Sequence, residues 1–257
     1  SGTFSFEAQQ VLGKAVVERV IGLLGTRFRV GPGPGGETAL LPINILEMQF
    51  RSGPGPLVCA GAGGSAALTE LTQRLLGQPA IHPPVTVRVL DFDAVNILSL
   101  PGGQILVFSG LLNYAENPEE VSGLLAHSLA HSYISQHTLI KSWVMEKGVS
   151  GLIRVFADNG FASDDAVIGR LAELALLNRN RQPVEMEADD IALNILEAAG
   201  INARPLADLI DRLPSFAQDL ASRVEEVVYR LSVVHSHPSS PERSAMIRAR
   251  AKQLGPA

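Results

Sequence analysis

Two histidines stand four residues apart in an apolar stretch of the chain, at His127 and His131. In a helix, residues four apart lie on one face, one turn from each other. Both imidazoles can therefore reach a single metal ion, and zinc binds imidazole nitrogen at about 2.0–2.1 Å. Two histidines can also share a helix by chance, so this pair alone leaves a metal site and a structural role both open.

A pair of carboxylates with the same spacing follows, at Glu185 and Asp189. Glu185 can complete a zinc site of two histidines and one glutamate, which leaves a fourth position for water or substrate. Asp189 can hydrogen-bond a ligating imidazole and fix its tautomer. The helix dipole also favours acidic residues in a first helical turn without any metal. The histidine pair leads us to favour the metal site.

The apolar periodicity indicates that few strands and many helices position these side chains. Helical spacing predicts helices over residues 7–24, 65–77, 119–137, 141–156, 166–178, 184–199, 205–213 and 217–231. Alternation predicts short strands over residues 38–50, 85–92 and 104–108. Strands followed by a run of helices favour an α+β fold with segregated layers.

The N-terminal part is divided by turns rich in glycine and proline. These turns lie at residues 31–36, 53–56 and 61–64. They predict an N-terminal appendage over residues 1–60, with a helix and short strands, and a larger domain over residues 61–257 that holds both residue pairs. We interpret the first helix, over residues 7–24, as a core helix rather than one lying on a membrane.

Composition narrows the classes of protein that this chain can belong to. The net charge is -5 and Lys and Arg do not cluster, which argues against a nucleic-acid partner. The single Cys59 excludes an internal disulfide and a cysteine-based zinc knuckle. No apolar run reaches the roughly 18 residues of a spanning helix. The opening Ser1-Gly2 is typical of a cleaved tag, so a membrane anchor could precede it in a longer protein.

Four blocks of sequence occur in the order typical of one known family. They are residues 96–103 with 107–111, residues 119–131, residues 185–189, and residues 236–238 with 241–243. In these blocks the chain resembles the zinc metallopeptidase family of the CAAX prenyl protease, HtpX and periplasmic outer-membrane quality-control proteases. In this gluzincin family an HExxH helix is followed by an ExxAD-type block. The resemblance implies a mainly helical zincin-type metallopeptidase domain with a small β-sheet.

The resemblance also implies roles for individual residues. His127, His131 and Glu185 match the zinc ligands. Asp189 matches the carboxylate that hydrogen-bonds a ligating histidine. His237 lies near the metal cleft by the same comparison, and so does a late arginine, Arg243. These two can position substrate or stabilise an oxyanion, or the histidine can block the open metal position.

Ser128 stands where the family has the glutamate of HExxH, so the motif here is His-Ser-Leu-Ala-His. That glutamate takes a proton from zinc-bound water and later delivers it to the leaving amine. A serine hydroxyl has no useful pKa near neutrality and is too short for this task. Because acid–base help is worth about 10²–10⁴-fold, we expect zinc binding to persist and efficient peptide hydrolysis to be lost.

Three explanations of the serine remain open: a natural pseudo-peptidase, an engineered inactive variant, or another carboxylate such as Glu187 in its place. On a helix Glu187 faces about 200° away from Glu185, which disfavours substitution. We favour the natural pseudo-peptidase and keep a non-catalytic polypeptide-binding module as an alternative function. Family analogy implies a polypeptide substrate or client and a bacterial cell-envelope location, periplasmic or membrane-associated through an upstream segment.

Overall fold

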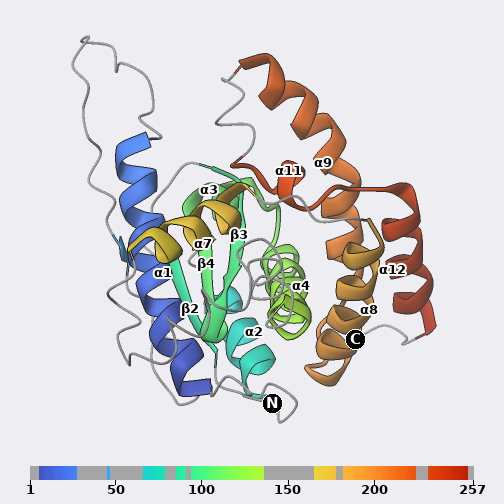
Figure 1. Ribbon diagram of the computed structural model, residues 1–257. Helices are drawn as coiled ribbons and strands as arrows, with labels where there is room; N and C mark the ends of the chain where they lie inside the picture. The colour runs from blue at the N-terminus through green and yellow to red at the C-terminus, as the bar shows by residue number, and fades with distance from the viewer. Residues whose placement is uncertain are drawn as a thin grey trace.

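The computed structural model describes residues 6–27, 45–46, 66–78, 85–90, 94–135, 165–177, 182–223 and 231–253. The helix predicted over residues 141–156 lies outside these ranges, as does most of the strand region predicted over 38–50. The described elements agree with the predicted class, an α+β fold in which many helices surround a small sheet (Figure 1).

The described strands form one four-stranded sheet with the order β1-β2-β4-β3. Its members are β1 (Ile45–Leu46), β2 (Thr86–Leu90), β3 (Ile97–Leu100) and β4 (Gln104–Phe108). β2 and β4 run parallel, whereas β1 and β3 are antiparallel to their neighbours. β3 is therefore an outer strand, and it lies beside helix α4 (Pro118–Ser135).

Strands β3 and β4 are joined by a 3-10 turn, η1 (Pro101–Gly103), that fits closely against the first helix, α1 (Phe6–Arg27). Gly102 has a φ of 69°, which favours glycine. A Cβ at this position would also lie 2.5 Å from the Cα of Gln10 in α1. Glycine is thus needed both for the turn and for the approach of the helix backbone.

Apolar residues on the two faces of the sheet belong to two separate clusters, as expected from the alternation of side chains in strands. One cluster includes Val87, Val89, Ile97, Ile105 and Val107, and the other includes Leu98, Leu100, Leu106 and Phe108. The first face packs on α2 (Ala66–Leu76) and α4, and the second on α1 and α7 (Asp165–Leu177) (Figure 1). The interpretation of α1 as a core helix is confirmed, because Val16, Val17 and Val20 are fully buried.

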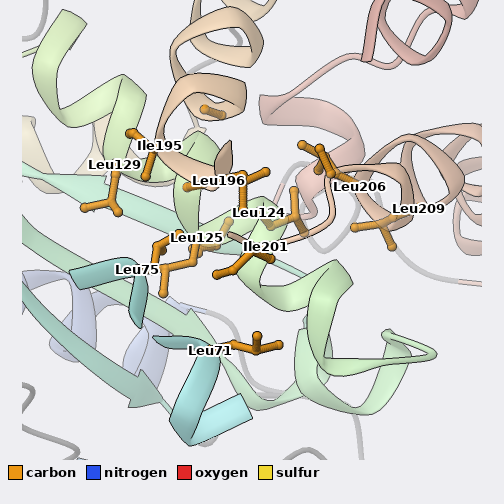
Figure 2. Packing of buried hydrophobic residues seen from close by; sticks show 14 of the residues in the cluster. Leu71, Leu75, Leu124, Leu125, Leu129, Ile195, Leu196, Ile201, Leu206 and Leu209 are labelled. Carbon is orange, nitrogen blue, oxygen red and sulfur yellow. The ribbon is translucent and has the colours of Figure 1, made fainter. Parts of the chain in front are cut away.

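Helix α4 lies between the sheet and a further group of helices. This group comprises α8 (Gln182–Ala198), α9 (Arg204–Arg223) and α12 (Pro241–Gln253). Figure 2 shows leucines of α4 packed against Ile195 and Leu196 of α8 and against Leu206 of α9. Gly123 allows α9 to approach, since a Cβ there would lie 2.7 Å from the Cβ of Leu206. Two short helices, α3 (Ser109–Tyr114) and α11 (Val233–Ser236), complete the described elements.

One helix prediction was wrong. The sequence predicted a break between helices over residues 205–213 and 217–231, but α9 continues through Pro214 to Arg223. Leu213 before the proline is buried, and Phe216 after it packs on the core. A proline inside a helix costs about 3 kcal/mol, and burial of apolar side chains at about 1.5–3 kcal/mol each offsets that cost.

Two further points concern domain limits and membranes. The boundary predicted near residue 60 stays a prediction, although α1 shares a core cluster with the sheet. Among the described helices, none combines the length and apolar character needed to cross a membrane.

Candidate metal centre

Helices α4 and α8 bring three potential metal donors together at the centre of the molecule. His127 and His131 lie one turn apart on α4, and their Nε2 atoms are 3.0 Å from each other. Glu185 of α8 places Oε2 at 3.1 Å from Nε2 of His127 and Oε1 at 3.0 Å from Nε2 of His131. All three side chains are buried.

A fourth donor comes from the segment before α12. His237 follows α11, and its Nδ1 lies 3.1 Å from Oε1 of Glu185 and 3.3 Å from Nε2 of His127. The donor atoms of His127, His131, Glu185 and His237 all lie within 4.8 Å of one another. The sequence pointed to His237 as a residue near the cleft, and the structure brings it into the cluster itself.

The geometry of these four donors fits a tetrahedral zinc ion. With zinc–nitrogen distances of about 2.0–2.1 Å, neighbouring donors in a tetrahedral site lie about 3.3–3.4 Å apart. The contacts of His127 with the other three donors, and of His237 with Glu185, are 3.0 to 3.3 Å and close to that value, and all four donors lie within 4.8 Å of one another. Three imidazole nitrogens and a carboxylate are also a donor set that suits zinc.

Asp189 supports this arrangement from behind His127. Its Oδ1 lies 2.8 Å from Nδ1 of His127, and both groups are fully buried. An Nδ1–H that donates to this carboxylate leaves the lone pair of Nε2 directed at the other donors. The structure thus places Asp189 where it can fix the tautomer of the first histidine.

Arg243 contacts both carboxylates and the backbone beside His237. Its Nε and one terminal nitrogen bind the two oxygens of Asp189 at 2.6 and 2.9 Å. The other terminal nitrogen lies 3.0 Å from Oε2 of Glu185 and donates to the carbonyl of Pro238 at 2.8 Å. The guanidinium is therefore engaged within the protein, and the side chain is buried.

Charge and burial shift the pKa values of the cluster in opposite directions. Burial lowers the pKa of His127, but the carboxylates of Glu185 and Asp189 outweigh it and raise this pKa to about 9. Burial and the charge of His127 lower the pKa of His131 to about 4. Burial would raise the pKa of Glu185, yet the neighbouring histidines hold it well below its usual range. Without a metal, these pKa values leave one positive charge on the α4 pair near neutral pH, on His127.

Ser128, between the two histidines, is buried, and its Oγ has no hydrogen-bond partner among the described residues. Its backbone carbonyl accepts hydrogen bonds from Oγ of Ser99 at 2.7 Å and of Ser132 at 3.2 Å. Ser99 lies on β3, so this contact joins the outer strand to the histidine helix. The carboxylate proposed as a substitute, Glu187, is exposed on α8.

A histidine pair on one helix, a glutamate and an aspartate on a second, and a small sheet beside them define a zincin-type metallopeptidase domain. Residues 66–251 match Peptidase family M48, and the chain belongs to this family. The family resemblance inferred from the four sequence blocks is thereby confirmed.

Curated relatives carry the names of proteases. The chain is 25% identical over 203 residues to the beta-barrel assembly-enhancing protease of Yersinia pestis, which covers 74% of this chain and 39% of that protein. It is 28% identical over 163 residues to the mitochondrial metalloendopeptidase OMA1 of Bos taurus, which covers 61% of this chain and 28% of that protein. The Arabidopsis thaliana mitochondrial metalloendopeptidase OMA1 is 26% identical over 161 residues, which cover 63% of this chain and 30% of that protein. The chain thus spans about two fifths or less of the length of these relatives.

Proposed function

We propose that this domain binds one zinc ion through His127, His131, Glu185 and His237, and that it hydrolyses peptides poorly or not at all. The observation that carries the proposal is the convergence of four buried protein donors at 3.0–3.3 Å contacts. A catalytic zinc site typically has three protein ligands and an open position, whereas a closed site has four. With zinc bound by the other three donors, His237 would fill the position that water or substrate needs.

The residue at position 128 supplies the second argument. Zinc bound at this site would supply a Lewis acid that activates water. Peptide cleavage also needs a neighbouring group that accepts the proton of the attacking water and passes it to the leaving amine. The Ser128 hydroxyl does not have the pKa for this, and the exposed Glu187 is turned away from the donor cluster.

Arg243 and Asp189 act in this proposal as supporting residues rather than as groups that touch substrate. Arg243 contacts both oxygens of Asp189, the partner of His127, and it also contacts Glu185. These contacts hold the two carboxylates in place. Carboxylate partners of ligating histidines typically change metal affinity about 10–100-fold when they are removed. We therefore assign Arg243 to positioning, not to oxyanion stabilisation.

Elemental analysis of protein purified without chelators tests the proposal, with casein cleavage measured on the same preparation. We expect one zinc per chain and no chelator-sensitive cleavage. His237→Ala removes one of the four donors. Its matched control is His235→Ala, because His235 lies two residues away and outside the four-donor cluster. Protein that folds normally but contains no zinc would overturn the proposal, and so would robust cleavage that a chelator abolishes.

A second candidate function is a non-catalytic module that binds a polypeptide client. The same four-donor site favours it, because a zinc ion there would join α4, α8 and the segment carrying His237 without turnover. Binding of unfolded protein by the intact, zinc-loaded domain would support the module. The codon for residue 128 in the native gene separates a natural pseudo-peptidase from an engineered variant.

We also propose a bacterial cell-envelope location, in the periplasm or at a membrane. The Yersinia pestis relative is named for β-barrel assembly, and the transmembrane β-barrels of bacteria lie in the outer membrane. The mitochondrial names of other relatives are a reason to test this directly. Fractionation of cells that express the native gene would decide between envelope and other compartments.

A further inference from the structure

The fourth donor, His237, is carried by residues 231–238, a segment that we call the strap. The strap includes the one-turn helix α11 (Val233–Ser236) and ends at Pro238, whose carbonyl binds Arg243. Its first residues lie beside residues 95 and 96, which immediately precede the outer strand β3.

Two hydrogen bonds hold the beginning of the strap. The backbone N–H of Val233 donates to the carbonyl of Val95 at 2.8 Å. The side-chain amide of Asn96 donates through Nδ2 to the carbonyl of Leu231 at 2.6 Å, and its Oδ1 accepts from the N–H of Ile97 at 2.8 Å. Asn96 is fully buried, so its amide depends on these partners.

The Asn96 side chain takes the place of a peptide unit between the strap and the outer strand. Like a peptide group in a β-ladder, it accepts from one chain segment and donates to the other. Its backbone carbonyl meanwhile accepts from the N–H of Phe108 in β4, which fixes the residue in the sheet. The strap is thereby attached to a rigid part of the core.

A rigid connection leads from this anchor to the metal ligand. The N–H of His237 donates to the carbonyl of Val233 at 2.8 Å, which closes the turn of α11. Val233 is also fully buried in the core. A displacement at Val233 is therefore transmitted through one helical turn to the imidazole of His237.

We propose that Asn96 is a positioning residue of the metal centre. It touches none of the four donors, and it acts by holding the strap where His237 completes the donor set. This inference rests on the proposed function, since it takes the four-donor cluster to be a zinc site. Because coupling between two equilibria is reciprocal, zinc in turn stabilises the attached strap.

A double-mutant cycle in zinc affinity tests the inference on the whole domain. Zinc affinity is measured by competition with a chelator for wild type, Asn96→Ala, His237→Ala and the double variant. We expect Asn96→Ala to lower affinity about 10–100-fold, as loss of a group supporting a ligand does. The double variant should bind no more weakly than His237→Ala alone, because Asn96 acts only through His237. Losses that multiply in the double variant would overturn the inference.

The matched control is Asn202→Ala. Asn202 is exposed, and its Oδ1 accepts from the N–H of Arg204 at the start of α9. This variant loses one asparagine hydrogen bond away from the strap, and its zinc affinity should equal that of wild type. The visible spectrum of the cobalt-substituted protein is a second readout. The Asn96→Ala spectrum should match that of His237→Ala, and a wild-type spectrum would contradict the proposal.

A second variant keeps the test valid if Asn96→Ala does not fold. Val233→Pro removes the N–H that binds Val95, at the first position of a helix where proline is tolerated. Ser232 before it already has φ -87° and ψ 154°, as a residue before proline requires. Val233→Ala keeps the N–H and is its control. Val233→Pro should lower zinc affinity further than Val233→Ala, and equal affinities would contradict the anchor.

Hydrogen exchange separates the failure of this inference from failure of the proposed function. In zinc-free protein, Asn96→Ala should speed amide exchange across residues 231–237 and leave α8 unchanged. Wild-type protein that binds no zinc would overturn the proposed function and this inference with it. Zinc binding by wild type with multiplying losses, or with unchanged exchange in the strap, would overturn this inference alone.

Discussion

The helix-borne donors and the strap-borne donor of the metal centre are held in different ways. His127, His131 and Glu185 stand on α4 and α8, two long helices that pack against each other over a continuous apolar core (Figure 2). His237 stands on the strap, which is attached through hydrogen bonds at its two ends. The difference teaches that one half of the site is set by the packing of two long helices, whereas the other half combines two buried side chains, Leu231 and Val233, with a few polar contacts that can be broken singly.

The largest effect should follow from removal of a helix-borne ligand. His131→Ala should weaken zinc binding more than His237→Ala does, because one of the three donors that it leaves, His237, stands on the strap rather than on α4 or α8. His237→Ala should keep measurable zinc, since three ligands on α4 and α8 remain. Elemental analysis after dialysis distinguishes the two. Equal zinc contents in these variants would show that the two halves of the site do not differ as described.

The next effect concerns catalysis. Ser128→Glu combined with His237→Ala should produce chelator-sensitive casein cleavage, because the first change adds a proton acceptor and the second frees a metal position. The acid–base contribution alone is worth about 10²–10⁴-fold in rate. Ser128→Glu by itself should be much less active while His237 fills the fourth position.

The outcome of this pair of variants also decides between the two candidate functions. A double variant that folds, binds zinc and cleaves nothing would show that Ser128 and His237 are not what keeps the domain from cleaving peptides, and the polypeptide-binding module would then be the better description. Strong activity of Ser128→Glu alone would instead show that His237 leaves the metal readily.

A smaller effect is expected at the contact between the two halves. Arg243→Lys keeps the positive charge but loses the two-pronged contact with Asp189 and the simultaneous contacts with Glu185 and Pro238. We expect zinc affinity to fall about 10–100-fold. Arg248→Lys, which alters a partly exposed arginine paired with Asp208, is the control and should leave affinity unchanged. An affinity loss shared by both variants would point to general destabilisation.

The last effect, the smallest for a single step of one pH unit, is a dependence on pH that arises within the helix-borne half. The pKa of His127 is raised to about 9, so zinc must displace its proton at neutral pH, whereas the pKa of His131 is lowered to about 4 and that group is already neutral. Displacement of one proton makes zinc affinity rise roughly tenfold per pH unit between about pH 7 and 9. Calorimetry in buffers of different ionisation enthalpy counts the released protons.

The same shift fixes the sign of the stability change in zinc-free protein. A pKa that folding raises contributes stability that is complete below the unfolded value of about 6.5 and is lost as the pH rises through about 9. The zinc-free domain should therefore unfold at lower denaturant concentration at pH 9 than at pH 7. A midpoint that is constant over this range would show that His127 carries no such proton.

Local spacing explains how much of the site could be predicted from the sequence. The separation of four residues between His127 and His131, and again between Glu185 and Asp189, is enough to place each pair on one helix face. The contact of His237 with His127 joins residues 110 positions apart, and no local periodicity encodes it. The anchor at Asn96 joins residues 135 positions apart, to Leu231. Family resemblance could mark such residues as relevant but could not assign their partners.

The fold shows the same division between local and long-range information. Strand β4 and helices α2, α7 and α8 match their predicted ranges to within one or two residues, because burial on a regular face leaves a clear period. The outer strand β3 was recognised only as part of a sequence block that resembles the family. All but one of its residues are buried, so apolar and polar residues do not alternate along it. Helix α9 was divided wrongly at Pro214, because tertiary burial on both sides of the proline outweighs the local signal.

The position of His237 along the chain has a consequence for biosynthesis. Along the chain α4 comes first, then α8 and finally the strap. A partly folded chain in which α4 and α8 have packed can offer His127, His131 and Glu185 to zinc before His237 arrives. During that interval the ion would keep an exchangeable position, and metal loading is expected to be easiest at that stage. The last step of folding would then be the arrival of His237 at a metal already in place, a non-local contact of the kind that forms slowly.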